Sequence, residues 1–477
     1  MSYQHILSKI PKIDRLLQDQ SIQLFLTQYP RARVVNVLRS ELQSLRNEIL
    51  QNESRFESSP ELLEYPTTLK RLVTALDLQL RPRASRCINA TGVVLHTGLG
   101  RAPLSSAAQD ALQQVAGGFA LVEYEIESGA RGDRHTIVEE MLIQLTGAEA
   151  AAVVNNNAAA TFLILNTLSQ GKQCVVSRGE LVTIGGSFRI PDIMRESGAL
   201  MVEVGTTNKT NIRDYAQAIN EYTGLLLKVH TSNYRIMGFH EDVPLEQLVE
   251  LGVQYQLPVL HDLGSGSLVD LSRYGLVKEP LVRESIDAGA DIVSFSGDKL
   301  IGGPQSGIIV GKKEFIARIK ANQVARTLRC GKLTFAALEA TLQLFFDEAK
   351  LLKQHRVMQM LTQSETKIRN RANKLKRMLA KIVERNGLVD VQRSSAEVGG
   401  GSLATVSLPT SVVALYLQNL HVDELAKQLR LSQPSIIPRV QQGQVFLDMF
   451  TVQDDELHFI VNALRNIIDK LENTADE

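Results

Sequence analysis

Hydrophobic residues recur with a helical period through the first 85 residues of the chain. Leucine and isoleucine return every three or four positions in IPKIDRLLQDQSIQLFL and ARVVNVLRSELQSLRNEIL, which is the spacing of an amphipathic helix. Pro30 and Pro60 interrupt this pattern, and proline punctuates helices because it lacks the backbone N–H. We predict a helical N-terminal domain over residues 1–86.

The pattern changes near residue 87. Short apolar runs alternate with helical stretches in the order AAAVV, KQCVVS, GLLLKVH, LPVLHD, ADIVSFS and SGIIVG. This alternation predicts a mainly parallel sheet covered by helices, in a large α/β domain over residues 87–350. Polar and glycine-rich segments follow the strand ends, where sheets of this kind bind ligands.

A third pattern begins near residue 335. A long helical stretch is expected through residue 387, and the short strands LATVSL and QVFLDM follow it among further helices. We interpret residues 351–477 as a small α+β C-terminal domain. Residues 351–385 hold 10 Lys and Arg but 2 Asp and Glu. A solvated helix face and a nucleic-acid contact over residues 367–385 are equally good interpretations of this charge.

Composition narrows the choice of protein class. The 477 residues carry zero formal net charge, so any nucleic-acid binding must come from local patches. The polar N-terminus and the lack of a long apolar run favour a cytoplasmic protein without a membrane span. Cys87, Cys174 and Cys330 are far apart and do not have the spacing of a zinc site. Cys330 lies near basic residues, but a packed thiol is the better interpretation.

One lysine calls for a chemical explanation. Lys299 stands in a glycine-rich turn between two apolar runs in SFSGDKLIGGPQSGIIVGKK, and a buried lysine is costly unless it is paired or used. A desolvated lysine amine can form a Schiff base with an aldehyde. Asp262 ends the strand LPVLHD 37 residues earlier. Its carboxylate can pair with a pyridinium nitrogen, although a turn residue is the alternative.

A third feature suggests a phosphate site. The stretch VVNNNAAATFLILNTL reads as a strand, a polar turn and a helix start, and helix N-termini attract phosphate. The backbone of Asn157, Ala158 and Ala159 would form the cradle, and Ser296 or Ser294 could donate to the same group. The three features together predict a site for pyridoxal 5'-phosphate (PLP).

Eight stretches, in order, resemble one enzyme family. The stretches are INATGVVLHTGLGRAPL, YEIESGARGDRH, SRGELVTIGGSFRIPDIM, GTTNKT, KVHTSNYRIMGF, HDLGSGS, SFSGDKLIGGPQSGIIVGKK and RTLRCGKLT. On these stretches the central domain resembles fold-type I PLP enzymes, and most of all the bacterial selenocysteine synthases, the L-seryl-tRNA(Sec) selenium transferases. They cover about residues 85 to 335, and the flanking segments match the family layout.

The resemblance implies roles for individual residues. It makes Lys299 the lysine that carries PLP and Asp262 the partner of its ring nitrogen. It also implies that Arg101, Arg326 and Arg329 bind an anion. Arginine suits phosphate-like groups, and two arginines three apart on one helix would share a face. No aromatic residue in SRGELVTIGG is a clear candidate to stack on the ring, and Phe188 is a poor one.

The resemblance also implies the reaction and its partners. Seryl-tRNA(Sec) would lose the serine hydroxyl by β-elimination, and selenophosphate would then supply selenium to give selenocysteyl-tRNA(Sec). The N-terminal domain would bind the tRNA, and the chains would form a homo-oligomer, a decamer, in which Arg101 could serve a neighbouring chain. Two alternatives stay open: a PLP-dependent lyase acting on a small amino acid or amino sugar, and a tRNA-binding protein without catalysis.

Overall fold

The computed structural model of the chain describes residues 3–184, 188–404 and 406–475. Its contacts divide the chain into two compact units, one of residues 1–87 with 431–435 and the other of residues 88–430 with 436–477. Each unit has hydrophobic clusters of its own. The three domain ranges proposed from the sequence stay a prediction.

The first unit is helical. Its helices are α1 (Tyr3–Leu7), α2 (Ile13–Leu16), α3 (Gln20–Gln28), α4 (Arg31–Gln51), α5 (Glu53–Ser58), η1 (Pro60–Leu63) and α6 (Tyr65–Leu80). One face of α4 is buried against one face of α6, as the helical period predicts. Arg71 of α6 adds a polar tie, since it donates at 2.7 Å to both Glu41 and Glu48 of α4.

A seven-stranded sheet forms the centre of the second unit. Its order is β2 (Ala150–Val154), β10 (Gly307–Gly311), β9 (Ile292–Ser296), β8 (Val259–Gly264), β7 (Thr223–Val229), β3 (Gln173–Ser177) and β6 (Leu200–Val204). The strands β9, β8, β7, β3 and β6 pair in parallel, whereas β10 runs antiparallel to both of its neighbours. The prediction of a mainly parallel sheet is confirmed.

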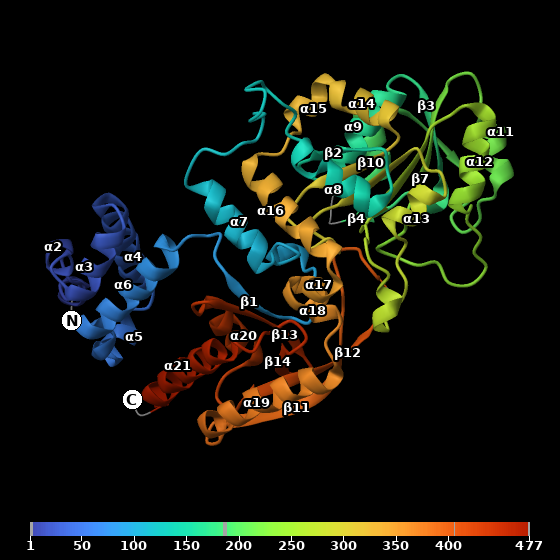
Figure 1. Cartoon of the computed structure of the whole chain (residues 1–477). Coiled ribbons are helices and arrows are strands. Elements are labelled where there is room, and N and C mark those ends of the chain that lie inside the picture. Colours follow the sequence, from blue (N-terminus) through green and yellow to red (C-terminus); the bar gives the residue numbers. More distant parts are fainter. Residues whose placement is uncertain (1–2, 185–187, 405, 476–477) are drawn as a thin grey trace. The chain divides into compact units, whose positions relative to one another are not determined.

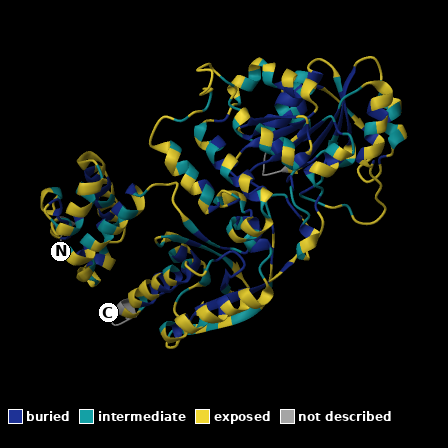
Figure 2. Cartoon of the chain, in the orientation of Figure 1, coloured by how far each residue is buried: buried dark blue, intermediate teal, exposed yellow. Residues whose placement is uncertain are grey.

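Helices cover both faces of this sheet (Figure 1). One face packs against α9 (Asn157–Ser169), α10 (Ile190–Glu196) and α14 (Lys313–Ala321). The other packs against α8 (Thr136–Thr146), α11 (Ile212–Ala218), α12 (Leu245–Tyr255), α13 (Val282–Asp287) and α16 (Lys332–Leu342). Successive residues of a strand point to opposite faces, so Ile308 and Ile309 of β10 join different cores. The inner strands are therefore buried on both sides (Figure 2), whereas the edge strand β6 is largely exposed.

The remaining short elements connect these layers. They are η2 (Thr97–Leu99), α7 (Ser106–Ala116), η3 (Arg178–Glu180), the two-stranded β4 (Thr183–Ile184) and β5 (Phe188–Arg189), η4 (Leu271–Tyr274) and α15 (Gln323–Thr327). Within the described residues, no helix is both long and apolar enough to cross a bilayer.

The helical stretch expected from about residue 335 to residue 387 is helical, but it is divided into several helices. The chain there forms α16, η5 (Gln343–Phe346), α17 (Glu348–Gln354), α18 (Arg356–Leu361) and α19 (Glu365–Val383). The side chains of Asp347, His355 and Ser364 each accept a backbone N–H at the start of a new helix. Such caps satisfy donors that a continuous helix would use internally, so each one starts the helix again.

The C-terminal part adds a five-stranded sheet. Its order is β1 (Cys87–Ala90), β13 (Ser435–Gln441), β14 (Gln444–Asp448), β12 (Leu408–Leu417) and β11 (Gly387–Ala396), and the helices α19, α20 (Val422–Leu431) and α21 (Leu457–Ala475) accompany it. The predicted strand in QVFLDM is confirmed as β14. A strand is also expected in LATVSL, residues 403–408. Residue 405 lies outside the described residues, and β12 begins only at the last residue of this run, Leu408.

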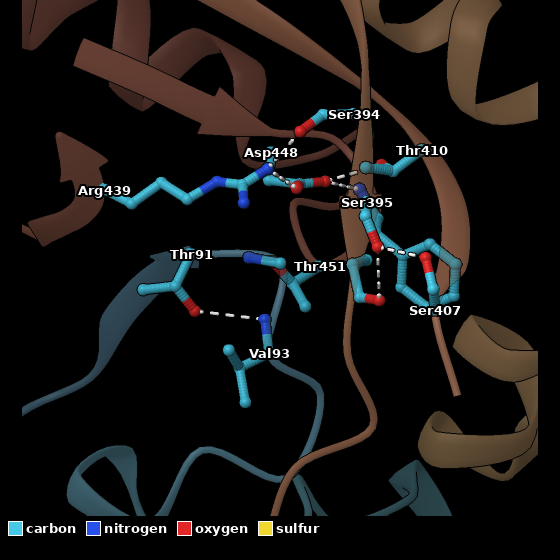
Figure 3. A network of polar contacts seen from close by, with 12 residues as sticks. Thr91, Val93, Ser394, Ser395, Ser407, Thr410, Arg439, Asp448 and Thr451 are labelled. Carbon is cyan, nitrogen blue, oxygen red and sulfur yellow. Dashed lines mark hydrogen bonds and ion pairs between the residues drawn. The ribbon is translucent and has the colours of Figure 1, made fainter. Parts of the chain in front are cut away.

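A buried carboxylate joins this sheet to the turn that follows β1 (Figure 3). Asp448 accepts from Thr410 at 2.6 Å and from Arg439 at 2.8 Å, and Arg439 also donates to Ser394. Gly92 lies so close that a Cβ there would overlap Asp448 Oδ2. Two residues further along the chain, the backbone N–H groups of Val94 and Leu95 donate to the backbone oxygens of Glu397 and Val398. These contacts fix the start of the segment that leads to Arg101.

Candidate active site

A cavity of about 290 Å³ opens at the carboxyl ends of β2, β7, β8 and β9. Because these four strands point the same way, their ends meet at one edge of the sheet. Six of the residues predicted from the sequence line the cavity, namely Arg101, Asn157, Ala158, Asp262, Ser296 and Lys299. Ala159, Arg326 and Arg329 are not among its lining residues.

Lys299 follows β9 and is 4% exposed. Burial lowers the pKa of its amine, and the positive charge of Arg101 lowers it further, while Asp262, Asp298 and Glu279 oppose the shift. A lowered pKa leaves more of the amine neutral near pH 7, and the neutral amine is the form that attacks a carbonyl carbon.

Asp262 lies near the end of β8 and is also 4% exposed. Its carboxylate accepts from Asn157 Nδ2 at 2.8 Å, from Thr161 Oγ1 at 3.0 Å and from the backbone of Gly264 at 3.1 Å. Burial raises the pKa of Asp262, and these bonds oppose the rise. A cationic N–H placed against the carboxylate would favour the charged form again.

The start of α9 partly fits the predicted phosphate cradle. Ala158 lines the cavity, and its small side chain lets a ligand approach the backbone. The N–H of Ala159 is occupied, since it donates to the capping side chain of Asn156 at 2.9 Å. The side chain of Asn157 points to Asp262 and not to a phosphate position. The sequence alone did not reveal this second role of Asn157.

The two serines of β9 differ in placement. Ser296 lines the cavity, whereas Ser294 is fully buried and is not among the lining residues. Residues two apart on a strand point to the same face, so alternation does not distinguish the two serines. Position along the strand separates them, because Ser296 is the residue at the carboxyl end.

Arg101 reaches the cavity from the segment after β1. Its guanidinium donates to Asp298 Oδ2 at 2.6 Å, and Asp298 directly precedes Lys299. Arg101 has a positive φ of 60°, an uncommon conformation for a non-glycine residue. The sequence analysis missed Asp298, although an acidic residue next to the candidate lysine in SGDKL was a signal for it.

The other two arginines are arranged differently from the prediction. Arg326 lies in α15, which ends at Thr327, and Arg329 lies beyond that end in a bridge with Val154. The two arginines therefore do not share one helical face, because Leu328 leaves the helical conformation. Arg329 Nη1 lies 3.6 Å from Glu123 Oε1.

Glu123 gathers three arginines in all. Arg134 and Arg131 donate to its two oxygens, and these bonds lower the pKa of Glu123 to about 2. Arg134 also donates to the backbone oxygen of Cys330. The Cys330 thiol itself is buried, and burial raises its pKa to about 11. A packed thiol, as favoured from the sequence, fits this placement.

Three buried polar atoms of the cavity residues have no hydrogen-bond partner within the described part of the chain. They are Arg101 Nε, Asn157 Oδ1 and Ser232 Oγ. Unpaired buried polar atoms are costly, so the cavity suits a ligand with polar groups on several sides. PLP fits this set: it has an aldehyde for Lys299, a ring nitrogen for Asp262 and a phosphate for the start of α9.

Other lining residues were not predicted from the sequence. Among them, His230 and Ser232 follow β7 in KVHTSNYRI. Phe188 of β5 lines the cavity as well, although the sequence made it a poor stacking candidate. The last two residues of the stretch searched for a stacking residue, 185 and 186, lie outside the described residues. No group of three or more potential metal ligands occurs in the described ranges.

Residues 87–453 match the family described as L-seryl-tRNA selenium transferase, and residues 7–46 match the selenocysteine synthase N-terminal family. The chain belongs to the L-seryl-tRNA selenium transferase family. This confirms the family inferred from the eight stretches.

Full-length relatives support the assignment. A protein of Carboxydothermus hydrogenoformans named L-seryl-tRNA(Sec) selenium transferase is 45% identical over 97% of this chain and 98% of its own length. Proteins of the same name from Clostridium botulinum strain Okra and Geotalea daltonii are each 43% identical, over 98% and 97% of this chain and the whole of their own. The selenium transferase family thus accounts for both units of the chain.

A solved structure shares the fold. The structure of D-glucosaminate-6-phosphate ammonia-lyase has a TM-score of 0.55 with this chain at 22% identity, and the match covers 80% of this chain and 95% of that one. The predicted class, a fold-type I PLP-enzyme fold with a helical N-terminal region, is confirmed.

Proposed function

We propose that this protein converts seryl-tRNA(Sec) to selenocysteyl-tRNA(Sec), with PLP as cofactor and selenophosphate as selenium donor. The observation that carries the proposal is the cavity in which a buried lysine and a buried carboxylate face unpartnered polar atoms. Relatives that match almost the whole chain bear the corresponding name, which supports the choice of substrate.

PLP would be held by residues of three strand ends. Lys299 would bind its aldehyde carbon and Asp262 its ring nitrogen, while Ala158, the backbone of Asn157 and Ser296 would surround its phosphate. Ala159 belongs to the same turn, but its N–H is used by the cap Asn156. When bound, PLP supplies an electron-withdrawing ring that stabilises negative charge at the α-carbon of an amino acid.

The chain's own residues would then handle protons and anions. Lys299 would take the α-proton of the seryl group. The amine that held the cofactor would be free at that point and would lie next to the α-carbon of the substrate. Arg101 is bound to Asp298, the residue before Lys299, and would face the selenophosphate anion from the cavity wall. Arg326 and Arg329 are the other two proposed anion ligands, although neither lines the cavity of this chain. Glu123 holds Arg329 at 3.6 Å, so donor binding would compete with that carboxylate.

The tRNA would be bound outside the cavity. The helical N-terminal residues 1–86 are the first candidate and the basic helix over residues 367–385 the second. In the basic helix, the buried guanidinium of Arg371 donates to the backbone oxygens of Met449 and Val452, so its charge is not available to a tRNA. The available charge there belongs to exposed residues such as Lys367 and Arg369.

We also propose a homo-oligomer, with a decamer as the expected form, acting in the cytoplasm. Large apolar side chains are exposed on two loops of the second unit, at Phe119, Leu121, Ile126, Met237 and Phe239. Exposed apolar groups of this size commonly mark protein contacts. A neighbouring chain would cover them and could share the cavity that contains Arg101.

An absorbance titration of the purified, PLP-loaded protein tests the function. Seryl-tRNA(Sec) should shift the cofactor band, whereas deacylated tRNA(Sec), ordinary seryl-tRNA and free serine should leave it unchanged. If small amino compounds or amino sugars shift the band and the tRNA does not, the lyase interpretation replaces ours. If nothing binds PLP, the protein is a tRNA-binding protein without this catalysis.

A further inference from the structure

His230 is placed in the cavity without a role in the reaction described so far. It follows β7, and its backbone N–H donates to the backbone oxygen of Asp262 at 2.9 Å. This bond fixes the histidine next to the residue that would hold the cofactor ring. Its side chain is 26% exposed, so the imidazole is half-buried and still reaches the cavity.

A buried carboxylate lies next to the imidazole of His230. Glu279 Oε2 lies 3.4 Å from His230 Nε2. Glu279 is itself held by two donors, Ser265 Oγ at 3.1 Å and the backbone N–H of Leu403 at 3.0 Å. A carboxylate fixed in this way holds the ring in one orientation. With Nε2 turned to Glu279, Nδ1 is the nitrogen left for a ligand.

The reaction needs a proton donor that the other groups do not supply. Hydroxide is a poor leaving group, so the serine oxygen must receive a proton as its bond to carbon breaks. Lys299 is occupied with the α-proton and Asp262 with the ring nitrogen. Asp298 is paired with Arg101. Of the described titratable residues that line the cavity, His230 is the one left unassigned.

We propose that His230 is the general acid that protonates the departing serine hydroxyl and that Glu279 is its positioning residue. The inference rests on the proposed function. Lys299 takes the α-proton, and the electron pair of that C–H bond becomes the second bond between the α- and β-carbons. The C–O bond breaks with its electron pair on oxygen, and oxygen takes the proton from His230 Nδ1. Water leaves, His230 becomes neutral and Lys299 carries the extra proton.

Substitution of the histidine is the first test. In the PLP-loaded full-length protein, His230→Gln should slow water loss from seryl-tRNA(Sec) about 100-fold or more, the lower end of what general acids contribute. The cofactor absorbance and the PLP dissociation constant should stay the same. His421→Gln is the matched control, because His421 also faces a carboxylate, Asp423 at 3.6 Å, but is exposed. It should react normally.

Two probes separate acid catalysis from a structural role. With 3-chloroalanyl-tRNA(Sec), whose chloride leaves without a proton, His230→Gln should react within a few-fold of the unsubstituted protein. Exchange of the α-proton with deuterium from solvent should also continue, because it requires Lys299 but no departure of the hydroxyl. Added imidazole should restore part of the activity of His230→Ala.

Each contrary result identifies a different error. Equal slowing with both leaving groups, or loss of α-proton exchange, would overturn the acid role. A shifted cofactor band or weaker PLP binding in His230→Gln would assign the histidine to cofactor positioning instead. Glu279→Gln should slow seryl-tRNA(Sec) more than the chloro substrate at an unchanged KM; equal effects would remove Glu279 from the proposal. If the unsubstituted protein leaves both tRNA substrates untouched, the proposed function fails and not this assignment alone.

Discussion

At the scale of single residues, the cavity is built from charges that would be unfavourable alone. Lys299 and Asp262 are each 4% exposed, and burial pushes their pKa values in opposite directions, down for the amine and up for the carboxyl group. Both shifts favour the neutral forms when no ligand is present. The two groups are therefore prepared for a partner that supplies a carbonyl carbon to one and a cation to the other.

Replacement of Lys299 tests this arrangement directly. Lys299→Ala should abolish turnover of seryl-tRNA(Sec), since the chain loses both its attachment point and its base. Borohydride reduction followed by mass spectrometry should fix PLP to the segment 292–312 of the unsubstituted protein but not to that of the variant. Lys312→Ala is the control, because Lys312 pairs with Asp291 at 2.6 Å away from the cavity. Labelling that persists in Lys299→Ala would place the cofactor on another lysine.

A second residue-scale prediction concerns pH. His135 Nδ1 accepts from the backbone N–H of Val153 at 3.1 Å, and burial lowers its pKa to about 4. Below about pH 6.5 the histidine is protonated in the unfolded chain but stays neutral in the folded chain. The free energy of unfolding therefore falls as the pH drops below about 6.5. The loss should reach about 2 kcal/mol by pH 5. Urea unfolding of His135→Gln, which keeps an acceptor but does not titrate, should show a smaller loss between pH 7 and 5.

At the scale of elements, strand ends and helix starts decide where chemistry is possible. The parallel strands place Asp262, His230 and Lys299 at one edge of the sheet. The start of α9 then fixes Asp262 through Asn157 and Thr161. Sequence periodicity predicted the strands and this helix, because both depend on local alternation of apolar residues. It did not predict that caps would divide the helical stretch between about residues 335 and 387 into several helices.

The turn after β1 gives a prediction at this scale. Gly92 has a φ of 80°, and a Cβ there would overlap the buried carboxylate of Asp448. Gly92→Ala should therefore lower the free energy of unfolding by about 2 to 4 kcal/mol, from backbone strain and overlap together.

The matched control is Gly443→Ala. Gly443 has a similar φ of 71° but open space around the Cβ position, so only about 1 kcal/mol should be lost there. Equal losses in urea unfolding of the two variants would show that contact with Asp448 contributes nothing.

At the scale of the whole molecule, the chain consists of two units with separate hydrophobic cores, which could carry separate functions. The hydrophobic cluster of the N-terminal helices shares no residue with those of the second unit. Binding of tRNA to one unit and chemistry in the other is compatible with this separation.

Deletion of residues 1–84 tests that division. The shortened protein should keep PLP absorbance, since none of the described cavity residues is removed. Its affinity for tRNA(Sec) should fall about 10-fold or more, because phosphate contacts supply most of the affinity for nucleic acid. Filter binding at two salt concentrations measures this. Undiminished affinity would move the tRNA site to the second unit, where the helix over residues 367–385 is the candidate.

The sequence by itself determined the order of strands and helices, the candidate lysine and carboxylate, and the family. These follow from local periodicity and from motifs that are contiguous in the chain. Only the tertiary structure decided which side chains meet. In the folded chain Asn157 donates to Asp262, and Arg101 pairs with Asp298. Arg329 lies outside the helix that contains Arg326, and Glu279 lies next to His230. Such pairs join residues far apart in sequence, and their contacts depend on packing geometry that no local pattern records.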